Sequence, residues 1–245
     1  MSLILLACAA CLVATAAVAL GAAREGDDAR NVLVGTADPD QLFGNGGPDV
    51  LVGLGSNDFL DAGAGDDRVD AGAGDDVING SSGDDDLDGD GGDDTAYAGP
   101  GDDRVAGGPG ADVLFGQIGD DRLFGGPGSD TLYTGPGVDF AFGGAGDDLI
   151  ASDLTDADPR SDPRPQAAPP AGVEVRGGNG DDSIRTGSGD DVVDGGDGDD
   201  RIDTGDGDDQ IDSRDGNADV VDCGPGRDEA VADRFDTLRS CIRDR

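Results

Sequence analysis

Residues 107–133 read GGPGADVLF-GQIGDDRLF-GGPGSDTLY when they are written in lines of nine. An aspartate returns at every ninth residue, and a leucine follows each aspartate two residues later. These pairs are Asp112 with Leu114, Asp121 with Leu123, and Asp130 with Leu132. A fixed short period of this kind is typical of stacked repeats, in which each unit packs only on its neighbours.

The same nine-residue frame extends over most of the chain. It runs without insertion for 13 units from Gly35 to Ala151, and for four more from Gly177 to Asp212. Position six of the frame is aspartate in all 17 units. These residues are Asp40, Asp49, Asp58, Asp67, Asp76, Asp85, Asp94, Asp103, Asp112, Asp121, Asp130, Asp139, Asp148, Asp182, Asp191, Asp200 and Asp209. Aspartate makes up 52 of the 245 residues, so chance does not fill this position.

Glycine, proline and the aliphatic residues keep to other positions of the unit. Position eight is apolar in all 17 units, and position four is glycine in all but two, which carry Asp38 and Ser56. Proline falls only at positions three and five, where a turn accepts a residue that donates no backbone hydrogen bond. The unit therefore predicts a six-residue Gly-rich turn and a three-residue strand, with position eight pointing inward.

Stacking of such units predicts that the aspartates bind metal ions. Two units form one coil of 18 residues, and successive coils lie about 4.8 Å apart, as neighbouring strands do. The aspartate of each unit then lies beside that of the second unit along, and such carboxylates repel unless a cation lies between them. Carboxylates and the carbonyl groups of Gly-rich bends are hard oxygen ligands, which suit Ca²⁺ better than Mg²⁺. This pairing gives eleven sites in the first block and two in the second.

The unit Gly107–Phe115 has glycine at positions one, two and four, aspartate at six and leucine at eight. This pattern resembles the hemolysin-type calcium-binding (RTX) nonapeptide family. The resemblance implies an all-β fold, a right-handed parallel β-roll or β-solenoid, with Ca²⁺ in the turns. It also implies that the 17 position-six aspartates and the turn carbonyls are the ligands. Thr36, Asp38, Asn45 and Leu54 depart from the glycine pattern, which makes the first units weaker candidates.

The composition limits the classes of function. Net charge is −39, so the chain would repel nucleic acid. Only three of the 55 acidic residues are glutamate, which indicates carboxylates held close to the backbone, although the base composition of the gene could also favour aspartate. A purely solvated acidic face would not keep aspartate, glycine and aliphatic residues in one phase. With no histidine in the chain, zinc and copper sites are not expected.

The N-terminal segment predicts export. Residues 1–23 carry no charged side chain and end in small residues, as a secretory signal peptide does, although the basic residues that usually open one are missing. The apolar stretch is also long enough to remain as an uncleaved membrane anchor. The expected location is therefore secreted, with tethering to a membrane as the alternative.

Two cysteines near the C-terminus, Cys223 and Cys241, can form a disulfide in an oxidising compartment, or remain as free thiols. The disulfide would contribute about 3 kcal/mol of stability. Residues 213–245 contain two degenerate units, shifted by one residue, and many arginines. We expect this region to cap the last edge of the stack.

The remaining boundaries follow the repeat frame. Residues 26–151 form the first repeat block and 173–212 the second, and the Pro-rich segment 152–172 between them reads as a loop or linker. One roll with a bulging loop is favoured over two separate rolls, and the frame alone leaves the choice open.

Position nine carries four aromatic residues in the middle of the chain. They are expected to point outward and are Phe115, Phe124, Tyr133 and Phe142. They could form an apolar stripe for self-association, although local packing is the simpler interpretation.

No catalytic pattern accompanies the repeats. The sequence has no HExxH motif, no histidine for a catalytic triad and no phosphate-binding Walker loop. We therefore expect a non-enzymatic, exported protein that folds on binding several Ca²⁺ ions, with a structural, surface or adhesion role and a cell-surface or matrix partner. The alternative is a protein related to a secreted toxin or hydrolase, in which the repeats only assist folding and export.

Overall fold

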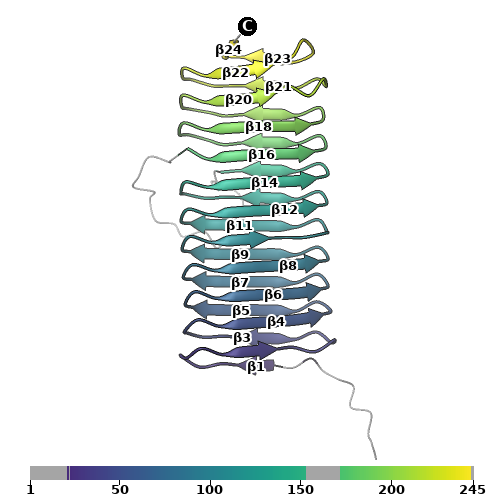
Figure 1. Cartoon of the computed structure of the whole chain (residues 1–245), viewed down its shortest axis with the longest axis vertical. Helices are drawn as coiled ribbons and strands as arrows, with labels where there is room; N and C mark the ends of the chain where they lie inside the picture. Colours follow the sequence, from purple (N-terminus) through teal and green to yellow (C-terminus); the bar gives the residue numbers. More distant parts are fainter. Residues whose placement is uncertain (1–20, 22, 153–171, 244–245) are drawn as a thin grey trace, which may run out of the picture.

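A computed structural model describes residues 21, 23–152 and 172–243, and its described part consists of strands joined by turns (Figure 1). The strands form two parallel sheets of 12 strands each, and successive strands alternate between the sheets. The chain therefore winds as a flat solenoid, with β1 at one end of the stack and β24 at the other. This arrangement confirms the parallel β-roll.

Sheet A contains the odd-numbered strands in sequence order. They are β1 (Ala23–Glu25), β3 (Gln41–Phe43), β5 (Phe59–Ala64), β7 (Val77–Ser82), β9 (Thr95–Pro100), β11 (Val113–Ile118), β13 (Thr131–Tyr133), β15 (Leu149–Ala151), β17 (Ser183–Arg185), β19 (Arg201–Asp203), β21 (Val220–Asp222) and β23 (Thr237–Arg239).

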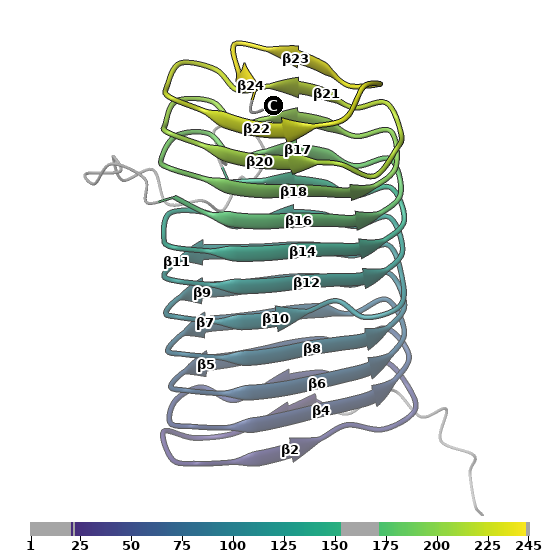
Figure 2. The same ribbon diagram turned by 45° about the horizontal axis from the view of Figure 1, so that its top comes forward.

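Sheet B contains the even-numbered strands and faces sheet A across a thin interior (Figure 2). They are β2 (Val32–Val34), β4 (Val50–Gly55), β6 (Arg68–Ala73), β8 (Asp86–Gly91), β10 (Arg104–Ala106), β12 (Arg122–Pro127), β14 (Phe140–Ala145), β16 (Glu174–Asn179), β18 (Val192–Asp197), β20 (Gln210–Ser213), β22 (Glu229–Ala232) and β24 (Ile242–Arg243).

The register of the ladders follows the repeat. Leu114 on β11 pairs with Leu132 on β13, and Val105 on β10 pairs with Leu123 on β12, so each residue lies beside the one 18 positions along. The position-eight side chains of both sheets point inward, are almost fully buried and form one continuous core cluster. One aliphatic residue per unit is enough because each sheet contributes a single row to a narrow interior.

Many strands are longer than the three residues that the sequence predicts. Eleven of them contain six residues and run on through positions one to three, as in Phe59–Ala64. Position one also faces inward, where only glycine or a small side chain fits, so the inward–outward alternation continues past position nine. In β12 and β14 the ladder joins Gly126 to Gly144 in the same way. The prediction of a six-residue turn was therefore wrong for these units.

The two repeat blocks lie in the same two sheets. Ala141 on β14 pairs with Val175 on β16, and Ile150 on β15 pairs with Ile184 on β17, each across 34 residues in place of 18. The insertion lies between β15 and β16 in the sequence. Of the Pro-rich segment 152–172, only Ser152 and Gly172 lie within the described residues.

The C-terminal end continues the roll with a changed spacing. Ile202 pairs with Val221 and Ile211 with Ala230, which is a separation of 19 residues. Cys223 and Cys241 form a disulfide that ties the end of β21 to the last turn. Cys223 is fully buried within the core cluster, so the disulfide joins the interior of the roll to its terminal coil.

Most of the signal segment expected over residues 1–23 lies outside the described residues, which include only Gly21 and Ala23 of it. Within the part of the chain that the structure describes, there is no helix long and apolar enough to cross a membrane.

Candidate metal centre

The position-six aspartates lie in two rows, one along each edge of the roll. We call the turns that follow sheet A strands the A-side turns and those that follow sheet B strands the B-side turns. The A-side row contains Asp49, Asp67, Asp85, Asp103, Asp121, Asp139, Asp191 and Asp209. The B-side row contains Asp40, Asp58, Asp76, Asp94, Asp112, Asp130, Asp148, Asp182 and Asp200. All of these side chains are buried at the point where the turn enters the next strand.

Within each row, a backbone-to-carboxylate ladder connects successive coils. The N–H of Asp103 donates to Oδ1 of Asp121 at 2.9 Å, and the N–H of Asp112 donates to Oδ1 of Asp130 at 2.8 Å. The other position-six pairs repeat this bond at 2.6–3.2 Å. Each aspartate therefore lies beside the aspartate of the next coil, as the sequence predicts.

The second carboxylate oxygen is the chemically unusual group. In 15 of the 17 predicted residues, Oδ2 is buried and has no hydrogen-bond partner. The exceptions are Asp40, whose Oδ2 accepts from the N–H of Thr36, and Asp191, whose Oδ2 accepts from the hydroxyl of Thr186. A buried anionic oxygen without a donor is strongly unfavourable, so each one requires a proton or a cation.

Glycine at position one brings Oδ2 close to the backbone. An ideal Cβ added to Gly125 would lie 2.3 Å from Oδ2 of Asp130 and 2.5 Å from the carbonyl oxygen of Gly143 in the next coil. At Gly44 the corresponding distances are 2.5 Å to Oδ2 of Asp49 and 2.1 Å to the carbonyl oxygen of Ala62. Each of these turns thus places a carboxylate oxygen and a backbone carbonyl oxygen against a residue without a side chain.

Position four adds a second row of carbonyl groups. Gly110 has φ +155°, and a Cβ there would lie 1.8 Å from the carbonyl oxygen of Gly92, one coil earlier. A carbonyl oxygen of the previous coil therefore lies against the glycine at position four in turns of this kind. Oxygen atoms of carboxylates and carbonyls are the ligands that Ca²⁺ prefers.

Burial shifts the acidity of the position-six carboxyls. Burial raises the pKa of Asp85 and of Asp121 to about 8, and neighbouring carboxylates in the same row add to the shift. Burial likewise raises the pKa of Asp94 and of Asp182 to about 7. The hydrogen bond from the backbone N–H opposes these shifts but is the smaller effect. Without a cation, these groups hold protons at a pH where ordinary aspartates have lost them.

The structure extends both rows beyond the predicted residues. Asp148 lies beside Asp182 across the inserted segment, because the N–H of Asp148 donates to Oδ1 of Asp182 at 2.8 Å. Asp219 and Asp228 continue the rows in the degenerate region, where they accept from the N–H groups of Asp200 and Asp209. Pairing within each sequence block missed these three pairs, although the one-residue shift after Asp212 was the signal for the last two.

One coil breaks the A-side row. Val173 stands where the aspartate would be, is buried, and donates its N–H to Oδ1 of Asp191 at 2.9 Å. Asp139 and Asp191 therefore have no carboxylate facing them across that coil. The B-side row has no such break among the described coils from Asp40 to Asp219.

The first units keep their backbone geometry despite their unusual residues. Asn45 and Leu54 adopt φ +73° and +85°, the left-handed conformation that glycine takes at this position in other units. Oδ2 of Asp49 and of Asp58 remains buried and without a partner, as in the regular units. The unit with Thr36 differs, because its carboxylate already accepts a bond from that residue.

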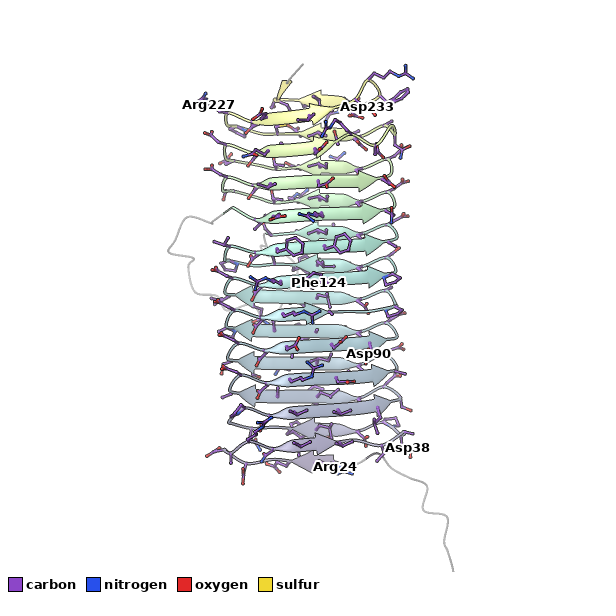
Figure 3. All side chains as sticks on the ribbon, in the orientation of Figure 1. Arg24, Asp38, Asp90, Phe124, Arg227 and Asp233 are labelled. Carbon is purple, nitrogen blue, oxygen red and sulfur yellow. A yellow bond between two sulfur atoms is a disulfide. The ribbon has the colours of Figure 1, made fainter. Side chains whose placement is uncertain are left out.

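A separate row of aspartates occupies position five on the outside of the turns. Asp120 is exposed and its Oδ1 accepts from the N–H of Val138 at 2.9 Å, and Asp102 accepts from Asp120 in the same way. Figure 3 shows oxygen-tipped side chains projecting from both edges of the roll. Their oxygens are solvated, so they do not share the chemistry of position six.

The four position-nine aromatic residues do not form one stripe. Phe115 and Tyr133 lie on sheet A, where Tyr97, Phe115 and Tyr133 stack at 4.8 and 5.1 Å between ring centroids. Phe124 and Phe142 lie on sheet B, the opposite face of the roll. Phe115 is only 6% exposed within its stack, so most of its ring surface is already covered.

The comparison with known protein families decides the assignment. A family model described as the RTX calcium-binding nonapeptide repeat (4 copies) matches residues 25–60, 43–78, 61–96, 79–114, 97–132, 115–150 and 176–211. The chain belongs to this RTX family. No curated protein matches the chain. The RTX match covers both repeat blocks, and the nonapeptides of this family are calcium-binding motifs.

The geometry of the RTX turns fits a calcium ion shared between coils. The described residues contain no group of three or more acidic or cysteine side chains that could hold a metal ion. Except beside Val173, each gap between the coils of the repeat blocks instead offers two carboxylates from one row, together with turn carbonyls. Such a set depends on stacking, because one turn alone supplies a single carboxylate.

Proposed function

We propose that this RTX protein binds Ca²⁺ between successive turns, and that the position-six aspartates of both rows are its carboxylate ligands. The unpartnered, buried Oδ2 atoms are the observation that carries this proposal. A divalent cation beside them would neutralise the charge and satisfy the oxygens together. Asp219 and Asp228 belong to the same set, since their Oδ2 atoms are buried and unpartnered too.

Binding and folding are coupled in this proposal. The unfolded chain contains no site, because each one is made from turns that lie 18 or more residues apart in sequence and meet only in the roll. Ca²⁺ therefore stabilises the folded state by its full binding free energy. Individual affinities of about 10⁻⁴ to 10⁻³ M, as in extracellular modules, are sufficient when many sites act together.

We further propose that the protein is exported and has a structural, surface or adhesion role without catalysis. The disulfide between Cys223 and Cys241 supports an oxidising compartment. Outside the cell, Ca²⁺ at millimolar concentration would keep the roll folded. Residues 1–23 are proposed as the signal segment, with an uncleaved anchor as the other outcome.

Two adjacent aspartates provide a matched test of the ligand assignment. Asp121 is 1% exposed with an unpartnered Oδ2, whereas Asp120 is exposed and solvated. Each carboxylate accepts one backbone hydrogen bond, Asp121 from Asp103 and Asp120 from Val138, so Asp121→Asn and Asp120→Asn remove the same charge and leave an acceptor. Calcium ions per chain would be counted by native mass spectrometry at saturating Ca²⁺.

Asp121 faces Asp103 on one side and Asp139 on the other, so D121N is expected to lose one or two ions. D120N is expected to keep the number found for the wild-type protein. Equal ion counts for both variants would show that position six does not hold the metal.

A further inference from the structure

Position one differs between the two rows in the C-terminal half of the roll. The B-side turns have glycine there in four successive coils: Gly125, Gly143, Gly177 and Gly195. The A-side turns of the same region have Thr134, Ser152, Thr186, Thr204 and Cys223. In this part of the roll, position one is therefore a glycine in the B-side turns, whereas in the A-side turns it carries a side chain near the position-six carboxylate.

The hydroxyl of Thr186 contacts the carboxylate oxygen that has no hydrogen-bond partner in most other turns. Its Oγ1 lies 2.5 Å from Oδ2 of Asp191, and both side chains are 1% exposed. Oδ1 of Asp191 accepts from the N–H of Val173. Both oxygens of this buried carboxylate thus have donors within the protein, in contrast to Asp182 and Asp200 in the B-side turns, whose Oδ2 atoms have none.

Thr204 stands at the same position one coil later but makes a different contact. It is fully buried, and its hydroxyl lies 3.3 Å from the carbonyl oxygen of Cys223, while Oγ1 of Thr186 lies 3.1 Å from the carbonyl oxygen of Thr204. Oδ2 of Asp209 has no hydrogen-bond partner, because the Thr204 hydroxyl donates to that carbonyl group of Cys223. The threonines therefore line the A-side edge up to the disulfide-bonded Cys223.

The coil before these turns also lacks a carboxylate. Val173 replaces the aspartate, so Asp191 has a carboxylate neighbour, Asp209, on one side only. An ion next to Asp191 could be shared only with Asp209. Both of those residues lie in turns where a threonine side chain fills position one.

We propose that Thr186, with Thr204 packed beside it, closes the Asp191–Asp209 gap to calcium, so that Asp191 is satisfied by a hydroxyl group in place of an ion, whereas Oδ2 of Asp209 binds an ion shared with Asp228. The proposal rests on the calcium-binding function above. It makes a hydroxyl group bonded to Oδ2 the reason that the Asp191 turn binds no metal, whereas Asp139 keeps an unpartnered Oδ2 beside Thr134. The two rows of this roll then differ in ion content, although their aspartates follow the same nine-residue frame.

The test counts ions in a variant that removes both hydroxyls. Thr186→Gly with Thr204→Gly installs the residue found in the B-side turns of the same coils, so the fold tolerates it. At saturating Ca²⁺, native mass spectrometry is expected to find one more ion per chain than in the wild-type protein. The conservative double variant T186S/T204S keeps the hydroxyls and is expected to keep the wild-type count.

The reverse substitution is made in the other row. Gly195→Thr places a threonine beside Asp200, where an added Cβ would meet Oδ2 at 2.6 Å and otherwise only the end of the Ile202 side chain within 3.4 Å, apart from the same carboxyl group. This variant is expected to lose one ion. A loss of affinity or of an ion in T186G/T204G would show that the threonines are ligands and overturn the proposal.

An unchanged count in T186G/T204G would overturn the proposal as well, whatever G195T does. Either of these results would overturn only the further inference and not the proposed calcium-binding function, provided that the wild-type protein binds Ca²⁺. If the wild-type protein binds none, the proposed function itself fails, and the two failures are therefore distinguishable.

Discussion

At the scale of single residues, the short arm of aspartate explains why glutamate is almost absent from the repeats. Oδ1 of Asp121 meets the backbone N–H of Asp103 while Oδ2 stays close to its own turn. An additional methylene group would move the carboxylate away from one of these positions. The preference for aspartate in the composition therefore has a geometric cause at position six.

The raised pKa values predict an unusual pH dependence for the calcium-free protein. The folded-state pKa of Asp85 and of Asp121 is about 8, whereas the unfolded chain has the ordinary value of 3.8. Folding therefore favours the protonated carboxyl, and the metal-free roll loses stability as pH rises from about 4 to about 8. In the presence of a chelator, circular dichroism should show more β-structure at pH 4 than at pH 8.

Saturating Ca²⁺ should remove that dependence near pH 8, because the cation then replaces the protons. The control is a pH series with Ca²⁺ present throughout. A chelated protein with the same spectrum at pH 4 and pH 8 would contradict the assignment of these carboxyls as buried and cation-dependent.

Glycine at position four predicts a strong effect of a single methyl group. Gly110 has φ +155° and no room for a Cβ next to the carbonyl oxygen of Gly92. Gly91, at position three, has only one atom near its ideal Cβ, the carbonyl oxygen of Pro109 at 4.0 Å. Gly110→Ala should lower the free energy of unfolding of the calcium-bound protein by at least about 2 kcal/mol.

Gly91→Ala is the matched control and should change stability by less than about 0.5 kcal/mol. Both values can be obtained from urea unfolding at a fixed Ca²⁺ concentration. Equal stabilities of the two variants would show that the turn can relax around a side chain at position four.

At the scale of the strand, each element contributes one buried aliphatic residue and depends on its two neighbours. Leu114 on β11 lies between Ala96 on β9 and Leu132 on β13 and has no exposed surface. Leu149 on β15 points outward and is 39% exposed. The same residue type thus occupies both sides of sheet A.

Leu114→Ala should destabilise the calcium-bound roll by about 2–5 kcal/mol, because a buried cavity replaces the side chain. Leu149→Ala should cost less than about 1 kcal/mol, since it removes a partly solvated side chain. Urea unfolding measures both changes. If L149A were the more damaging variant, the inward direction of position eight would be wrong.

The sequence predicts the direction of the strands better than their length. Position eight is regular enough to place one row of inward side chains in both blocks, although position one also faces inward and was not predicted to do so. The extension of the strands through positions one to three could not be read from the sequence, because glycine and polar residues there look like a turn. They form a ladder because the next coil supplies an identical backbone at the same place, as for Gly126 and Gly144.

The interruptions of the rows were harder to foresee for a similar reason. The frame of the second block, continued nine residues back from Asp182, places Val173 at the aspartate position, but it does not show what the backbone there contacts. Val173 fills that position through its backbone N–H, and only the pairing of β14 with β16 reveals it. The hydroxyl of Thr186 was likewise invisible as a partner until Asp191 was placed beside it.

At the scale of the whole molecule, repulsion between negative charges destabilises the folded state, and the disulfide stabilises it. The chain carries a net charge of −39, and stacking brings its carboxylates close together. The disulfide closes a loop of 18 residues at the C-terminal end, which should add about 3 kcal/mol. This end of the roll therefore has a source of stability that does not depend on metal.

Replacing both cysteines, in C223S/C241S, should raise the Ca²⁺ concentration needed for half-maximal folding and lower the melting temperature at a fixed Ca²⁺ concentration. Circular dichroism during a calcium titration measures the first change. As the matched control, the same calcium titration is run on wild-type protein with the disulfide intact and on wild-type protein with the disulfide reduced. Identical midpoints for these two samples would show that the terminal coil adds no stability to the roll.

The most direct test of the account is the far-ultraviolet circular dichroism of chelator-treated protein at pH 8 before and after addition of millimolar Ca²⁺, with Mg²⁺ as the control ion. We predict a disordered spectrum before addition, a β-sheet spectrum with Ca²⁺, and a much smaller change with Mg²⁺. A β-sheet spectrum that persists after complete removal of metal, or a disordered one that Ca²⁺ leaves unchanged, would contradict the coupling of calcium binding to folding.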